Sequence, residues 1–212
     1  MSPFNSAYNL NGEIANNFKK LQYRYYVDRF MVHLKNSGFL PRDAPTLLKK
    51  ADDLTVELDA LVRDTRVSKK YLEFDVSIAK EHLDLLVKKL EPIGHLDHVR
   101  HLVEEKIEKE KALDDAVFYF DNERFWECHE VLESVWKATY EGEKDLVQGI
   151  ILVAAALVHY QKDENEICLS IMKRAMEKLA ASTGKYHGMD VDEFKKKVAD
   201  MIKTENITVF TI

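Results

Sequence analysis

The segment from Asp145 to Tyr160 constrains this chain most, because it is apolar on nearly every side of the helix that it predicts. A helix of that kind must be buried all round, in the core of a protein or in a membrane. Its longest apolar run, from Gly149 to Val158, has ten residues, about half of the roughly 20 that a membrane-spanning helix needs. We therefore expect a bundle of helices around this segment, and no membrane partner.

Four amphipathic stretches supply the partners of this central helix. In each of them apolar residues recur three and four positions apart, which predicts a helix with one apolar face. The last begins at Asp190, with Glu193 three residues later as in a capping box. The stretches are Ile107–Phe120, Arg124–Tyr140, Ile167–Leu179 and Asp190–Ile202. The sequence thus predicts an all-α multihelical domain over residues 104–212, with a strand-like tail at Ile207–Ile212.

Residues 21–103 show alternation of apolar and polar residues instead. Two runs with a period of two, at 56–62 and 72–78, predict a β-hairpin, and the polar segment Arg63–Ser68 predicts its turn. Glu73 and Asp75 fall on the polar side of the second run, so we expect both to face solvent.

The other predicted elements complete a small α+β domain. They are a strand at Tyr23–Leu34, for which a helix is the open alternative, helices at Thr46–Leu54 and Ala79–Leu90, and a short strand at His98–Val103. The order β-α-β-β-α-β is that of a ferredoxin-like module. Residues 1–20, rich in Asn, Ser and Gly, predict a poorly ordered arm. The predicted fold is an α+β ferredoxin-like module followed by an all-α domain, with helix dominating overall.

The charge distribution argues against nucleic acid as a partner. Residues 1–105 carry 16 basic and 16 acidic side chains, so the whole net charge of −6 lies in residues 106–212. Nucleic-acid binding draws on a basic face, which neither half offers. Two cysteines are too few for a disulfide framework, and no leader opens the sequence, so we expect a cytoplasmic protein.

Residues 120–136 carry a recognisable pattern. They read Phe-Asp-Asn-Glu-Arg-Phe-Trp-Glu-Cys-His-Glu-Val-Leu-Glu-Ser-Val-Trp, an aromatic pair, then His-Glu, then Glu and Trp at helical intervals. This resembles the signature of the domain of unknown function 309 family, and residues 146–159 resemble its second signature helix. The resemblance covers about residues 110–180, with Cys128 where a small residue such as alanine is expected. It implies a compact multihelical array and no established activity.

On the signature helix, His129 and Glu133 lie one turn apart beside the apolar face, between Trp126 and Trp136. Side chains four residues apart on a helix are close enough to hydrogen-bond or to share a metal ion. Two interpretations remain open. The pair is either a metal or acid–base site, or a buried histidine and carboxylate that satisfy each other.

Other polar side chains lie near this pair. A step of 100° per residue puts Glu130 at the rim of the apolar face and Glu127 on the solvated side. On the central helix Gln148 and His159 share a face but lie roughly 16 Å apart along the axis, so they cannot bind one ion. A metal site needs a third ligand from a neighbouring helix. We predict no metal cofactor; if one binds, its candidate ligands are His129, Glu133 and His159.

These observations favour a non-catalytic ligand-binding or assembly protein, in which a groove around the Trp126–Trp136 helix receives a small molecule, a peptide or a second subunit. The groove, or buried polar network, comprises Trp126, His129, Glu130, Glu133, Trp136, Gln148 and His159. The alternative is a metal-assisted hydrolase that uses His129, Glu130 and Glu133 with His159. The sequence has no Gly-rich phosphate loop, Gly-x-Ser-x-Gly elbow or HExxH motif, and so no recognised catalytic machinery.

Overall fold

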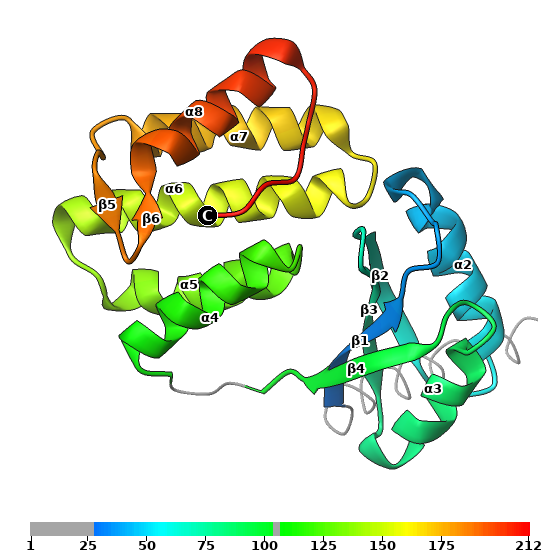
Figure 1. Cartoon of the computed structure of the whole chain (residues 1–212). Helices are drawn as coiled ribbons and strands as arrows, with labels where there is room; N and C mark the ends of the chain where they lie inside the picture. Colours follow the sequence, from blue (N-terminus) through cyan, green and yellow to red (C-terminus); the bar gives the residue numbers. More distant parts are fainter. Residues whose placement is uncertain (1–27, 104–106) are drawn as a thin grey trace, which may run out of the picture.

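The computed structural model of this chain describes residues 28–103 and 107–212 (Figure 1). Helix dominates these residues. The arm predicted over residues 1–20 lies outside them, as does the start of the strand predicted from Tyr23. Within the described ranges, no helix combines the length and the apolarity that crossing a bilayer requires.

The N-terminal part is a four-stranded antiparallel sheet with two helices on one face. Its strands are β1 (Asp28–Lys35), β2 (Leu61–Val67), β3 (Tyr71–Ile78) and β4 (Leu96–His101). Their order across the sheet is β2-β3-β1-β4. The helices are α2 (Ala44–Thr55), after a short 3₁₀ turn at Pro41–Asp43, and α3 (Leu83–Leu90), after one at Lys80–His82. The chain order of strands and helices is thus the predicted one.

One face of the sheet forms an apolar core with these helices. Phe30 and Phe74, on adjacent strands, are buried in one cluster with Leu47 of α2 and Leu86 of α3. Alternation puts every second side chain of each strand on this face. The period of two predicted at 72–78 therefore identified the face that α2 and α3 cover.

The C-terminal part is an array of helices around α6. Its elements are α4 (Lys109–Asp121), α5 (Phe125–Ala138), α6 (Glu141–Tyr160), α7 (Asn165–Leu179), the two-residue strands β5 (Lys185–Tyr186) and β6 (Met189–Asp190), and α8 (Val191–Thr204). Figure 1 shows α6 between α5 and α7. Val153, Ala154 and Leu157 of α6 are fully buried, so the prediction of a central helix is confirmed. The Asp190 carboxylate accepts from the Glu193 N–H at 3.0 Å, as the capping pattern predicted.

Two local predictions are wrong. The segment Arg63–Ser68 is no turn, because all of it up to Val67 belongs to β2, and Val56–Asp59 forms the turn after α2 instead. Charged residues in β2 gave this strand the polarity of a loop. The predicted terminal strand is irregular chain that packs on the helices: the Phe210 ring lies 5.2 Å from Phe120, between ring centroids.

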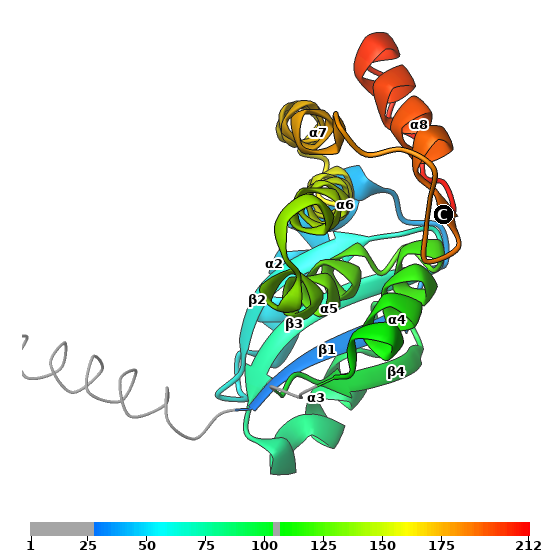
Figure 2. The same cartoon turned by 90° about the vertical axis from the view of Figure 1, so that its left-hand side faces the viewer.

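The second face of the sheet is also covered, which overturns three predictions of exposure. Glu73 is 0% exposed and Asp75 3%, although both were expected to face solvent. Glu127, expected on the solvated side of its helix, is 0% exposed. The reason is that the start of α5 lies against this polar face. In Figure 2, which looks from the helical side, α4 and α5 stand in front of the sheet.

Candidate functional site

A row of polar side chains crosses the second face of the sheet. The strand register pairs Arg66 with Glu73, Glu73 with His33, and His33 with His98, on four neighbouring strands. Residues paired in this way point to the same face. Arg66, Glu73 and His33 are at most 1% exposed. The His98 ring stacks on that of His33, with centroids 4.1 Å apart.

Glu127, in the first turn of α5, adds a second carboxylate to this row from the helix that covers the polar face. Its Oε2 lies 3.2 Å from His33 Nε2, and Oε1 of Glu73 lies 3.5 Å from the same nitrogen. Arg124, just before α5, donates to both oxygens of Glu127. Arg66 Nε donates to Glu73 Oε2 at 2.9 Å. Two buried carboxylates, each held by an arginine, thus face one buried imidazole.

Trp126 adds an aromatic contact beside this network. The guanidinium carbons of Arg29 and Arg66 lie 5.1 and 5.5 Å from the centre of its ring, within cation–π distance. Arg29 is fixed by two hydrogen bonds to Asp75, at 2.8 and 2.5 Å. The indole is therefore held by two side chains of the sheet.

A second set of contacts joins the α4–α5 turn to the hairpin of β2 and β3. Glu123 has a φ of 59°, a left-handed conformation that is uncommon outside glycine. Its Oε2 accepts the backbone N–H of Lys69 at 2.9 Å, and its backbone carbonyl accepts Gln161 Nε2 at 2.6 Å. The backbone carbonyl of Gln161 in turn accepts the Val67 N–H at 3.0 Å. The strained turn is thus fixed by both parts of the chain.

The electrostatics of the network favour a positive charge between the two carboxylates. Burial alone would raise the pKa of Glu127, but His33 and Arg124 outweigh it and hold this pKa far below its ordinary value. Burial alone would lower the pKa of His33, but Glu127 and Glu73 outweigh it and raise this pKa. The pKa of Glu73 is lowered, because His33 and Arg66 outweigh its burial.

The hydrogen bonding of this network is nevertheless incomplete. Neither ring nitrogen of His33 has a hydrogen-bond partner among the described residues, and Glu73 Oε1 has none either. His33 Nε2 therefore lies between two carboxylate oxygens without being aligned on either. Among the described residues, His33, Glu73 and Glu127 form the one group of three or more whose atoms are placed to hold a metal ion, all within 4.8 Å of one another.

The structure separates most of the residues predicted from the signature helix. His129 Nε2 lies 3.7 Å from Glu133 Oε1, and Nδ1 lies 3.3 Å from Glu130 Oε1. The His129 side chain is 25% exposed, and those of Glu130 and Glu133 are each 46% exposed. The interpretation of His129 and Glu133 as a buried pair is therefore wrong. The reason is that α5 turns Cys128 and Val131 into the helical core, which leaves His129 at the edge.

The other predicted residues have contacts or burial of their own. Nδ1 of His159, at the C-terminal end of α6, pairs with Glu164 Oε2 at 2.5 Å. Trp136 is partly buried, with Lys144 Nζ 4.4 Å from the centre of its ring. Gln148 is partly buried on α6. Of the predicted set, Trp126 is the residue that the structure brings to the buried network.

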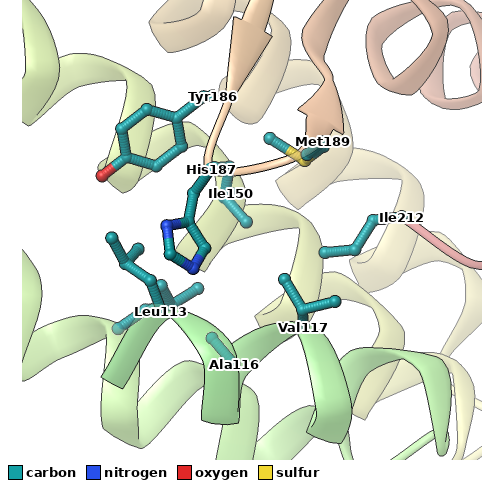
Figure 3. A pocket seen from close by; sticks show the side chains of 9 residues that line it. Leu113, Ala116, Val117, Ile150, Tyr186, His187, Met189 and Ile212 are labelled. Carbon is teal, nitrogen blue, oxygen red and sulfur yellow. The ribbon is translucent and has the colours of Figure 1, made fainter. Parts of the chain in front are cut away.

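A shallow apolar pocket in the helical part is a weaker candidate (Figure 3). Leu113 and Val117 of α4, Ile150 of α6 and Ile212 line it. The polar groups at its edge are already paired, since Tyr186 donates to Glu143 and His187 Nε2 lies 2.8 Å from Asp114 Oδ1. This pocket offers no free chemical group to a ligand.

Three comparisons with known proteins gave matches to this chain. Residues 113–171 match the family described as a domain of unknown function (DUF309), which confirms the resemblance seen in the sequence. An uncharacterized protein of Aquifex aeolicus (strain VF5) is 25% identical over 113 residues, or 53% of this chain and 34% of its own length. The chain thus spans about a third of that relative. The crystal structure of a conserved hypothetical protein from Thermus thermophilus, 25% identical, matches 43% of this chain and 95% of its own, with a TM-score of 0.39.

Proposed function

We propose that this chain, whose residues 113–171 match the domain of unknown function 309 family, is a non-catalytic binding protein whose signature helix docks a folded α+β module. One observation carries the proposal. Four residues within one five-residue stretch of the signature make side-chain polar contacts with the α+β part or with each other: Glu123, Arg124, Trp126 and Glu127. In this chain the docked module is the chain's own N-terminal part.

The composition of this contact is that of a binding interface. Tryptophan and arginine are the residues that most often dominate the binding energy of interfaces, especially where they are packed and desolvated. Here Trp126 lies against two arginines, and Glu127 is fully buried against Arg124 and His33. The charges are paired across the contact, which supports recognition of one particular partner surface.

The same burial argues against catalysis at the network. General acid–base groups must come within hydrogen-bond reach of a substrate. His33, Glu73 and Glu127 are each 0% exposed, so a substrate would meet no reactive atom there. The alternative of a hydrolase built on His129 and Glu133 lacks a third ligand, because among the described residues these two and His159 form no group whose atoms could share a metal ion.

We further propose that the two parts are separate domains, a ferredoxin-like module at about residues 21–103 and the helical array at 104–212. The strand order β2-β3-β1-β4, with helices after β1 and β3, supports the ferredoxin-like assignment. Each part also has an apolar cluster of its own, with no residue in common. The buried free thiols of Cys128 and Cys168 suit the cytoplasm, where we place this protein.

A chain cut between its two parts tests the docking. We would insert a protease site between residues 103 and 107, cleave the folded protein, and analyse the fragments by gel filtration and native mass spectrometry. The two fragments should stay together, because the contact buries Glu127 and holds Trp126 against Arg29 and Arg66. Separation of the fragments of the parent chain immediately after cleavage would contradict the proposal.

Two alanine variants of the cleavable chain provide the comparison. Trp126→Ala should weaken the association of the fragments by at least about 30-fold, as expected for an interface residue worth about 2 kcal/mol. Tyr140→Ala is the matched control, since this aromatic residue of the helical part is 86% exposed. Its fragments should associate like those of the parent.

A further inference from the structure

We infer that His33, Glu73 and Glu127 bind a divalent first-row metal ion such as Zn²⁺, which joins β1, β3 and α5 at the centre of the docking contact. The inference rests on the proposed docking, because Glu127 reaches the other two residues across that contact. It adds a ligand that the docking by itself does not require.

Two of the three donor separations match those around a shared ion, and all three donor atoms lie within 4.8 Å of one another. Zn²⁺ holds nitrogen and oxygen donors at about 2.0–2.2 Å, which sets neighbouring donors of a tetrahedron roughly 3.4 Å apart. The distances from His33 Nε2 to Glu127 Oε2 and to Glu73 Oε1 are 3.2 and 3.5 Å. One imidazole and two carboxylates are ligands that zinc accepts.

Buried polar atoms of Glu73 and His33 that lack a hydrogen-bond partner support a cation at the same position. Glu73 Oε1 and both ring nitrogens of His33 are buried without a hydrogen-bond partner in the part of the chain that the structure describes. Buried polar atoms are normally satisfied, so each such atom calls for an explanation. A cation between Nε2 and the two oxygens would satisfy two of these three atoms at once.

The surrounding residues hold the three ligands in position. Arg66 takes the other oxygen of Glu73. Arg124 donates to both oxygens of Glu127, including the Oε2 that faces His33, and so fixes this carboxylate in place. Stacking against His98 fixes the plane of the His33 ring. Outer contacts of this kind orient metal ligands in proteins. The charges of Arg66, Arg124 and Arg100, the last of which lies 3.2 Å from Glu127 Oε1, oppose a cation. Asp64 Oδ2 lies 3.2 Å from Arg66 and offsets part of that charge.

The competing explanation is a proton. A protonated His33 would also place a positive charge between the two carboxylates. It would hold the network without any metal. Zinc binding to the intact chain separates these alternatives, since only the first predicts a stoichiometric metal.

Zinc is the probe, and the chain is made without a histidine tag. After removal of bound metal with a chelator, Zn²⁺ is titrated by calorimetry, and metal content is measured after gel filtration. The parent should bind about one zinc per chain and gain thermal stability with it. Glu73→Gln, which keeps the shape of the side chain, should bind at least about 100-fold more weakly. Glu133→Gln, on the partly exposed pair with His129, should bind and be stabilised like the parent.

Three results would overturn the inference: a parent chain with less than about 0.1 zinc after reconstitution, loss of zinc in Glu133→Gln, or full affinity in a folded Glu73→Gln. If Glu73→Gln does not fold, the melting temperatures of the parent and of Glu133→Gln with and without zinc still test the inference. An equal zinc-induced rise in both melting temperatures supports the metal site, and the absence of a rise contradicts it. Fragments of the cleaved chain that stay together in chelator, while the parent binds no zinc, would leave the docking in place and remove the metal site alone.

Discussion

Replacing Glu127 by alanine should destabilise this protein far more than replacing Glu133, although both are glutamates of α5. Glu127 is fully buried, and its removal leaves Arg124, whose side chain is 10% exposed, and His33, at 0%, without a shared carboxylate. Removing one partner of a buried ion pair costs about 3–5 kcal/mol, because the other charge stays desolvated. That is a large part of the roughly 5–15 kcal/mol that stabilises a typical domain.

The expected loss of unfolding free energy in Glu133→Ala is much smaller. Its side chain is 46% exposed and its Oε1 lies 3.7 Å from His129 Nε2, so solvent screens the interaction. Exposed pairs of this kind contribute about 0–1 kcal/mol. Both substitutions place alanine in the same helix, so the difference in helix propensity cancels. We therefore expect a difference of about 2–5 kcal/mol between the two variants.

Urea unfolding of both variants beside the parent measures this difference. The experiment is run with a chelator present, so that a bound cation contributes nothing. The fluorescence of Trp126 reports the contact with the sheet and that of Trp136 the helical part, and these are the two tryptophans of the chain. Circular dichroism of the helices provides an independent signal. Equal losses of unfolding free energy in the two variants, or a larger loss in Glu133→Ala, would refute the burial of Glu127 against the polar face of the sheet.

Two further predictions concern the helical core. Gly149→Ala would place a methyl carbon 2.5 Å from Leu179 Cγ, whereas Gly142→Ala in the same helix meets nothing within 4 Å. We expect the first to cost about 1–3 kcal/mol and the second to be neutral or slightly stabilising; equal urea midpoints would contradict the close approach of α6 and α7. Burial raises the pKa of Cys168 to about 12, so a fraction on the order of 10⁻⁴ is thiolate near pH 8. A thiol reagent should label neither Cys168 nor the buried Cys128 until urea unfolds the chain, and rapid labelling of the native protein would show that these thiols are accessible.

The sequence by itself determined the elements whose environment is uniform. The segment around Val153 and Ala154 is apolar on nearly all sides, so it could only be a buried helix, whatever packs on it. Alternation through Leu72, Phe74 and Val76 likewise identified an apolar sheet face, since a strand exposes its side chains to two sides. These patterns repeat within a few residues and need no knowledge of distant parts of the chain.

Only the tertiary structure decided what covers the polar side of these elements. A charged side chain opposite an apolar face is expected to meet water, and this reasoning placed Glu73 and Glu127 in solvent. Both are buried because each finds its counter-charge elsewhere in the chain: Glu73 on Arg66 of the neighbouring strand, and Glu127 on Arg124 beside it and on His33 of the sheet. Helical and strand periods describe one element at a time. They cannot show that two polar faces will be pressed together, because the favourable energy arises only once those faces meet.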